Sequence, residues 1–258
     1  MNETYKNYFS LKSAAERYDK GRPRFHSFVI GKIKKFLALE NSFELALDVG
    51  CGTGLSSIAL KEISEKVVGI DISAGMLNQA KKTDDIQYVL ASAENLPLCT
   101  GKFDLITISQ AVHWVDKEKL FAEADRVLKP ESLLIAYDNY FQGQMLGNPA
   151  FTDWYKEEFL DEFPVPPRGA RAFVATSVNA QDFILKHEEF NENTLEFSAE
   201  EMVNYLVTIS NVIARVENGA QPIEEVYDRL TESIKPFFNE TRRKFAFINP
   251  IWYLQRNS

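Results

Sequence analysis

The sequence predicts an α/β protein with a doubly wound, mainly parallel sheet, helices on both faces of that sheet and a mostly helical cap. Two observations and one general rule support this prediction. Between residues 43 and 138, short apolar runs alternate with amphipathic stretches of helical periodicity. The apolar runs are continuous, as in strands that a parallel sheet buries on both faces. Right-handed crossovers between such strands place the intervening helices on both sides of the sheet.

The core is expected at about residues 40–138. Five short segments rich in apolar residues predict its strands, at residues 43–49, 67–72, 86–92, 103–109 and 132–137. Amphipathic segments between the strands predict helices, at residues 54–63, 74–82 and 117–128. The alternation of these two patterns is what indicates a doubly wound sheet.

The flanking segments predict the cap, which we expect from about residues 1–39 and 140–240. Residues 12–38 carry two helical patterns that are broken at Gly21 and Pro23, whereas residues 141–173 are rich in Phe, Trp and Pro without the rhythm of a strand. The C-terminal part predicts a strand or hairpin, two helices and a terminal strand, at residues 187–197, 199–216, 222–237 and about 244–255. We therefore expect residues 1–258 to form a single domain.

Composition narrows the function classes. The chain has 29 basic and 37 acidic residues and a net charge of -8, which argues against a nucleic-acid ligand. It lacks the uncharged apolar stretch of about 20 residues that a membrane span requires, and its polar amino terminus does not resemble a signal peptide. Cys51 and Cys99 suggest neither a disulfide framework nor a metal site. We expect a cytoplasmic protein that binds a small molecule.

A glycine-rich turn follows the first predicted strand. It contains Gly50, Gly52 and Gly54 in the sequence LDVGCGTG and runs directly into a predicted helix. Glycines at such a turn let a ligand approach the backbone closely. Asp71 ends the second predicted strand, where a carboxylate can accept hydrogen bonds from both hydroxyls of a ribose. The alternative is a simple glycine turn and a helix-capping aspartate.

The spacing of this turn indicates which nucleoside it binds. Dinucleotide sites have G-x-G-x-x-G, and the position of the third glycine is Leu55 here. The spacing is instead G-x-G-x-G, with Asp48 two residues before Gly50. This pattern resembles the first motif of class I methyltransferases that use S-adenosylmethionine (SAM). The resemblance implies that Asp48, Gly50, Cys51 and Gly52 contact SAM, whose sulfonium and ammonium groups suit an acidic turn lined by carbonyl groups.

The resemblance continues through the next two motifs. In DISAGML, which is similar to the family's second motif, Ile72 and Met76 would flank the adenine. In ASAENLPL, which is similar to the third, Ser92 occupies the position of the usual aspartate. The resemblance therefore implies that Ala93 or Glu94 supplies the contact to the adenine amino group.

Two further segments make the resemblance more specific. FDLITISQAVHWVD is similar to the fourth motif and places Gln110 and Trp114 near the cofactor. AERYDKGRPRF, before the core, contains Tyr18 and is similar to the segment that closes over the cofactor in related proteins. Together they resemble the subgroup around trans-aconitate methyltransferase, whose named members methylate small carboxylic acids. Residues 1–25 are accordingly expected to form a mobile lid.

Three side chains have two interpretations each. His113 is either a general base that titrates near neutral pH or a packed residue that orients its loop. Trp114 either holds the sulfonium by a cation–π contact or belongs to the core. Arg22 either binds a substrate carboxylate, alone or with Arg24, or is a surface charge beside Asp19.

The expected activity is SAM-dependent methyl transfer to a small molecule, with O-methylation of a carboxylic acid as one form of it. An ionised carboxylate needs no base, whereas a phenol or an alcohol does. A SAM-binding protein without catalysis is the main alternative, and Leu55 argues against a nicotinamide-dependent oxidoreductase. The sequence does not predict the oligomeric state.

Overall fold

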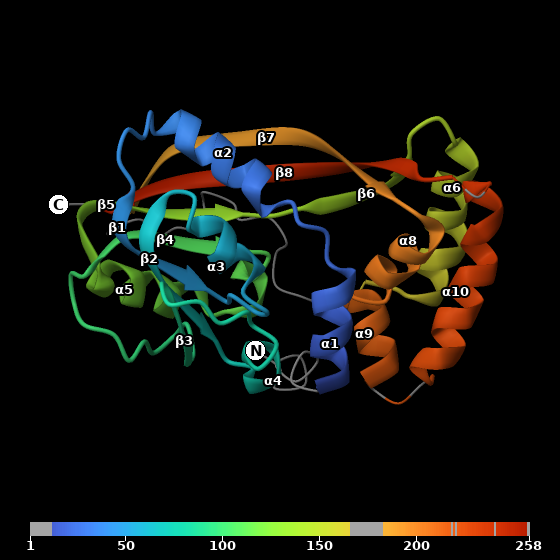
Figure 1. Ribbon diagram of the computed structural model, residues 1–258, viewed down its shortest axis with the longest axis horizontal. Coiled ribbons are helices and arrows are strands. Elements are labelled where there is room, and N and C mark those ends of the chain that lie inside the picture. Colours follow the sequence, from blue (N-terminus) through green and yellow to red (C-terminus); the bar gives the residue numbers. More distant parts are fainter. Residues whose placement is uncertain (1–11, 166–182, 218, 220, 240, 257–258) are drawn as a thin grey trace.

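The computed structural model describes residues 12–165, 183–217, 219, 221–239 and 241–256, and it confirms the doubly wound α/β fold (Figure 1). These residues form one sheet of eight strands in the order β3-β2-β1-β4-β5-β8-β6, with β7 paired to the other edge of β8. The parallel part consists of β1 (Phe43–Val49), β2 (Ser64–Asp71), β3 (Ile86–Leu90), β4 (Phe103–Ser109) and β5 (Leu128–Tyr137). Their carboxyl ends therefore meet at one edge of the sheet.

Apolar residues on the helices explain how both faces of the parallel part are covered. Val29, Ile30 and Ile33 of α2 (His26–Phe36) pack with residues of α3 (Leu55–Leu60) on one face. The buried side of α5 (Lys117–Val127) packs on the other face, through residues that include Leu120 and Ala124. A four-residue helix, α4 (Ala74–Leu77), begins at Ser73, whose hydroxyl accepts a hydrogen bond from the backbone N–H of Met76. These helices support the carboxyl ends of the parallel strands.

The antiparallel strands extend the sheet away from the core. The long β8 (Arg243–Arg256) pairs with β5 through its carboxyl half and with β6 (Tyr140–Met145) through its amino half. The equally long β7 (Phe183–Phe197) runs along the opposite edge of β8. Figure 1 shows the ribbon of β7 and β8 running from the core to a group of helices at the other end of the molecule.

These helices form a second lobe with its own apolar core, which we call the helical lobe. It contains α6 (Pro149–Trp154), the π-helical turn η3 (Tyr155–Phe159), α7 (Leu160–Glu162), α8 (Ala199–Leu206), α9 (Ser210–Glu217) and α10 (Ile223–Phe238). Phe151, Val203 and Leu230 are buried there against Phe245 of β8. Between the two lobes lies α1 (Lys12–Gly21), which contacts both α4 and α8. No helix among the described residues is long and apolar enough to cross a bilayer.

Most expected elements are confirmed, and three are not as predicted. Residues 141–173 were expected to have no strand, but residues 140–145 form β6, because β8 pairs with them from 100 or more residues away. The helix expected at 74–82 ends at Leu77 and continues as turns with i→i+3 hydrogen bonds. The helix expected at 199–216 is divided near Thr208, whose hydroxyl donates to the carbonyl of Tyr205.

Candidate active site

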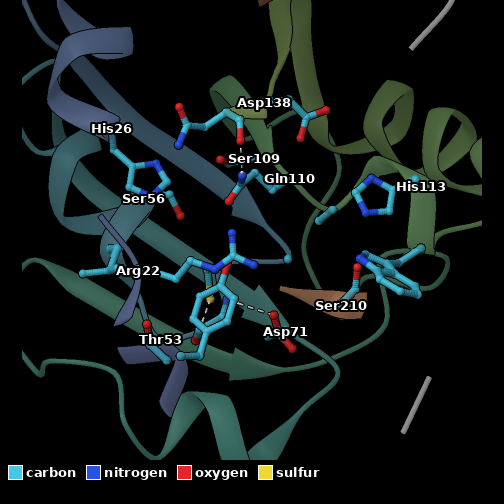
Figure 2. A pocket seen from close by; sticks show the side chains of 18 of the residues that line it. Arg22, His26, Thr53, Ser56, Asp71, Ser109, Gln110, His113, Asp138 and Ser210 are labelled. Atoms are coloured by element: carbon cyan, nitrogen blue, oxygen red, sulfur yellow. Dashed lines mark hydrogen bonds between the residues drawn. The ribbon is translucent and has the colours of Figure 1, made fainter. Parts of the chain in front are cut away.

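A cavity of about 840 Å³ opens at the carboxyl edge of the parallel strands, between the core and the helical lobe (Figure 2). Open α/β sheets bind ligands at this edge, and the volume lies in the range of roughly 300–1,000 Å³ that is usual for small-molecule sites. Every predicted site residue except Asp48 lines it. They are Tyr18, Arg22, Gly50, Cys51, Gly52, Asp71, Ile72, Met76, Ala93, Glu94, Gln110, His113 and Trp114.

The glycine turn forms the floor of the cavity. Gly50, Gly52 and Gly54 all have positive φ angles, of 68°, 55° and 81°. A Cβ atom on Gly50 would lie 2.6 Å from the Cβ of Ala111, two residues after the end of β4, so the turn lies directly against the segment that follows this strand. Non-glycine residues adopt this backbone region at a cost. The glycines therefore let the turn pass close to β4 and expose its peptide groups to the cavity.

Asp71 is held rigidly beside this turn. Its Oδ2 accepts a hydrogen bond of 2.8 Å from the backbone N–H of Gly52, and its Oδ1 accepts one of 2.8 Å from the backbone N–H of Ser73. Burial raises the pKa of Asp71. Each carboxylate oxygen has a further lone pair, so the side chain suits the two hydroxyls of a ribose. Next to it, Ile72 is 53% exposed and Met76 is buried.

Asp48 is fully buried below the turn and does not line the cavity, so its expected contact with SAM stays a prediction. Its Oδ2 accepts hydrogen bonds of 2.6 Å from the hydroxyls of Ser56 and Ser57, and its Oδ1 accepts one of 3.3 Å from Thr107. Burial raises its pKa to about 6. These bonds connect Asp48 to the start of α3 and to β4, so its carboxylate supports the glycine turn from below.

The segment after β3 reaches the cavity through Ala93 and Glu94. The carboxylate of Glu94 accepts hydrogen bonds from the hydroxyl of Ser92 and, at 3.1 Å, from the backbone N–H of Asp116. Ser92 itself does not line the cavity. A carboxylate is thus present near the position of the usual aspartate, displaced by two residues along the chain.

Gln110 follows β4 with a φ angle of 54°, in the left-handed region that is unfavourable for residues other than glycine. Its backbone N–H donates to the carbonyl of Tyr137 at 3.0 Å, and its side-chain amide donates to the carbonyl of Asn139 at 3.1 Å. A short 3₁₀ turn, η2 (Val112–Trp114), then places the half-buried rings of His113 and Trp114 at the cavity, with 5.1 Å between their centroids.

Arg22 follows α1 and connects it to the helical lobe. Its Nη2 donates a hydrogen bond of 3.0 Å to the carbonyl of Thr208, and its guanidinium carbon lies 4.6 Å from the ring centroid of Tyr18 and 5.7 Å from that of Tyr205. Figure 2 shows Arg22 between His26 and Asp71. Burial, together with the charge of Arg22, lowers the pKa of His26 to about 3, so that this histidine is neutral.

Sequence reasoning missed the residues that line the half of the cavity next to the helical lobe. Asp138 follows β5, is 2% exposed and accepts a hydrogen bond of 2.7 Å from the hydroxyl of Tyr140. Its position at the carboxyl end of a predicted strand was a usable signal. Phe141, Tyr155 and Tyr205 also line this half, and no motif marks them.

Comparisons with known proteins agree with this geometry. Residues 47–136 match the family described as "Methyltransferase domain". A Dictyostelium discoideum protein described as a methyltransferase is 32% identical over 125 residues, which are 48% of this chain and 47% of that protein. The malonyl-[acyl-carrier protein] O-methyltransferase of Buchnera aphidicola is 34% identical over 131 residues, 48% of this chain and 53% of that enzyme. The chain thus spans about half the length of the curated relatives it matches.

A solved structure described as a type II methyltransferase from Anaeromyxobacter dehalogenans has the same fold over almost the whole chain. The TM-score is 0.63 at 24% identity, and the match covers 91% of this chain and 95% of the other. The family match falls on the segment that carries the glycine turn, Asp71 and Gln110. Residues 47–136 of this chain therefore match a methyltransferase domain, within a fold shared with this solved structure.

Proposed function

We propose that the protein transfers the methyl group of SAM to a small molecule that binds in the half of the cavity next to the helical lobe. The observation that supports this most directly is the geometry of Asp71, whose two oxygens are fixed by backbone N–H groups at the edge of a cavity with an open glycine turn. The residues present fit SAM, which supplies an activated methyl group on a sulfonium when bound.

Apart from that of Asp48, each predicted contact has a physical basis in this arrangement. Asp71 would bind the ribose hydroxyls, and the exposed Ile72 and the buried Met76 would pack against the adenine. The peptide groups of Gly50, Cys51 and Gly52 line the cavity for the methionine part. Ala93 and Glu94 would contact the adenine amino group, and Gln110, Trp114 and Tyr18 would enclose the reacting end.

We further propose that the acceptor atom is a carboxylate oxygen, as the resemblance to the trans-aconitate methyltransferase subgroup suggests. A guanidinium binds carboxylates through short charge-assisted hydrogen bonds, and Arg22 lies on the side of the helical lobe, bonded to Thr208. An ionised carboxylate needs no general base. His113 would then orient its turn beside Trp114 and would not take a proton from the substrate.

Calorimetry with SAM and with S-adenosylhomocysteine (SAH) tests the cofactor. We expect binding at micromolar concentrations or tighter, and we expect Asp71→Ala to weaken it by about 1.5 to 3 kcal/mol, the range for hydrogen bonds to a charged group. Asp84→Ala is the matched control, because Asp84 is an exposed carboxylate in the turn before β3. A chain that binds NADH and ignores SAM would contradict the proposal.

Methyl transfer needs a separate measurement, because SAM could also bind without reaction. Small organic acids and phenols should be incubated with the full chain and SAM, and SAH release should be compared with methylated product detected by mass spectrometry. Asp71→Ala should lower turnover at limiting SAM by roughly 10- to 150-fold, in proportion to the weaker binding of SAM. If SAH binds tightly and no compound is methylated, the protein is a SAM-binding protein of another function.

A further inference from the structure

The charges around the cavity limit what an acceptor can carry. Among the described residues that line it, Arg22 is the one permanent cation, whereas four side chains are acidic: Asp71, Glu94, Asp138 and Glu188. His26 adds no positive charge, because it is neutral. In the proposed function Asp71 and Glu94 bind the cofactor, so Asp138 and Glu188 are the acidic lining residues left for the acceptor, with a single guanidinium to compensate the carboxylates of a polyanion. The cavity thus favours a ligand with one negative charge.

The wall beside Arg22 is aromatic. Phe141 of β6 packs edge-to-face against Tyr155 and Tyr205, with centroid distances of 5.1 and 5.7 Å. Tyr155 fits against the bare backbone of Gly143, where a Cβ atom would lie 2.3 Å from the ring. Tyr205 is 2% exposed, and Ile209 continues the same wall. Packed rings of this kind offer a rigid apolar surface that binds planar or hydrocarbon groups.

The guanidinium lies against this aromatic wall. Arg22 lies over the rings of Tyr18 and Tyr205, and its contact with Thr208 fixes it at the junction of α8 and α9. The cation and the apolar surface are therefore neighbours in one half of the cavity. A ligand that uses both needs its single charged group directly beside an apolar body.

We propose that the acceptor is a monocarboxylate with an apolar, preferentially aromatic, body, and that polycarboxylates are excluded. This inference rests on the proposed function and specifies its substrate. One carboxylate oxygen accepts hydrogen bonds from Arg22, and the body lies against Phe141, Tyr155 and Tyr205. The trans-aconitate-like substrates that the sequence resemblance suggests, which carry three carboxylates, do not suit this cavity.

The chemical step balances without any further reagent. The second carboxylate oxygen attacks the methyl carbon in line with the carbon–sulfur bond, and a carbon–oxygen bond forms as that bond breaks. The electron pair of the broken bond goes to sulfur, which becomes the neutral thioether of SAH, while the acid becomes a methyl ester. No proton is transferred. The residues of the chain orient the acid and exclude water from the transfer site.

Binding of acids to the complex of the full chain with SAH tests the proposal without relying on turnover. Calorimetry should compare trans-cinnamate and octanoate with trans-aconitate and citrate, and cinnamamide serves as a neutral match for cinnamate. We expect the monocarboxylates to bind at least about tenfold more tightly than the other three compounds, a difference of about 1.4 kcal/mol. Turnover with SAM should follow the same order.

Substitutions then separate the two parts of the recognition. Arg22→Gln should weaken cinnamate binding by roughly 10- to 100-fold, as expected for loss of hydrogen bonds to a charged group, while SAH binding stays within about twofold. Phe141→Leu should weaken the binding of cinnamate more than the binding of octanoate. Phe28→Leu is the control, because Phe28 is a partly exposed residue of α2 that does not line the cavity.

The outcomes distinguish this inference from the proposed function. If SAH fails to bind, the proposed function itself is wrong. If SAH binds and trans-aconitate binds as tightly as cinnamate, the inference is wrong and the proposed function stands. The same holds if SAH binds and cinnamamide binds as tightly as cinnamate. If Arg22→Gln weakens the binding of SAH and leaves the binding of cinnamate unchanged, Arg22 binds the carboxylate of the cofactor. That result also overturns the inference.

Discussion

The backbone of Gly21 lies directly against the carbonyl group of Asn204, so closely that a Cβ atom on Gly21 would lie 2.1 Å from the carbonyl oxygen. This contact joins the end of α1 to α8 of the helical lobe. It also fixes the position of the next residue, Arg22, whose guanidinium bonds to Thr208. Gly21, which has no side chain, thus determines the position of Arg22. Among the described residues that line the cavity, Arg22 is the one permanent cation.

Gly21→Ala should therefore be destabilising, because α1 must move away from α8. We expect a loss of about 1 to 3 kcal/mol in the free energy of unfolding, the usual cost of overpacking, measured by urea denaturation. Gly31→Ala in α2 is the matched control, since among the described residues nothing beyond its chain neighbours and the backbone of its own helix lies within 4 Å of the added Cβ. In a helix interior that change should stabilise by about 0.5 to 1 kcal/mol. Equal effects of the two substitutions would contradict the role of the contact.

Burial of Asp48 predicts a pH dependence of stability. Its pKa is raised from 3.8 to about 6 in the folded protein, so the folded state holds this proton more tightly than the unfolded chain does. Its contribution to the free energy of unfolding falls as the pH rises from about 4 to 6, by up to about 3 kcal/mol. Asp48→Asn stays neutral throughout, so the variant should lack this decline and should be at least as stable as the wild type at pH 7.5.

Urea denaturation at several pH values between 4 and 8 measures this difference. The hydroxyls of Ser56, Ser57 and Thr107 can rotate to suit an amide, so the fold should persist. Asp84→Asn removes an exposed carboxylate and should leave the pH profile unchanged. If Asp48→Asn and the wild type show parallel profiles, the buried carboxylate is not the origin of the pH dependence.

The parallel core could be predicted from the sequence because its signals are local. Each strand is a continuous apolar run, and the glycine turn and Asp71 stand at strand ends that meet at one edge. The helical lobe could not be predicted in this way. β6 is a strand because β8 pairs with it, and Tyr155 and Tyr205 reach the cavity only once the long ribbon of β7 and β8 has placed their helices there.

Asp48 shows the opposite limit of sequence reasoning. Its place in the motif indicated a contact with the cofactor, but the spacing alone does not say on which side of the turn its carboxylate lies. Ser56 and Ser57 are consecutive residues at the start of α3, and the carboxylate points there because it accepts a hydrogen bond from each hydroxyl. Position in a motif thus placed Asp48 next to the cavity and left the role of this residue open.

Asn249 should be important for the connection between the lobes. It is fully buried in β8, and its side-chain amide donates to the carbonyl of Asp138 at 3.0 Å and to Oδ1 of Asn139 at 2.9 Å, between the parts of β8 that pair with β5 and with β6. Asn249→Ala leaves buried acceptors without a donor and should cost about 2 to 4 kcal/mol in the free energy of unfolding.

Gln255→Ala provides a comparison on the same strand. Its amide donates to the carbonyl of Glu131 at 3.0 Å in an exposed setting, so its removal should cost less than about 0.5 kcal/mol. Both values come from urea denaturation under identical conditions. A loss at Asn249 as small as that at Gln255 would show that water replaces its hydrogen bonds and that the connection does not depend on this residue.

Limited proteolysis tests the predicted lid. Residues 1–11 of the expected lid lie outside the described residues, while Tyr18 and Arg22 line the cavity and Lys20 and Arg24 are exposed nearby. Trypsin should cleave after Lys20 and Arg24, which requires local opening of the segment that encloses the ligand. A ligand that binds only the closed form, at about 100 times its dissociation constant, should slow this cleavage by about 100-fold.

The comparison needs an internal reference site, and Lys82 is suitable because it is exposed in the segment before β3 and does not line the cavity. Its cleavage rate should be the same with and without SAH. Protection after Lys20 and Arg24 alone would show that the segment closes over the ligand, since inhibition of the protease itself would slow all three sites together. Equal rates at Lys20 and Arg24 in both samples would mean that SAH does not hold this segment closed, and the lid would then have to be abandoned as the means of excluding water.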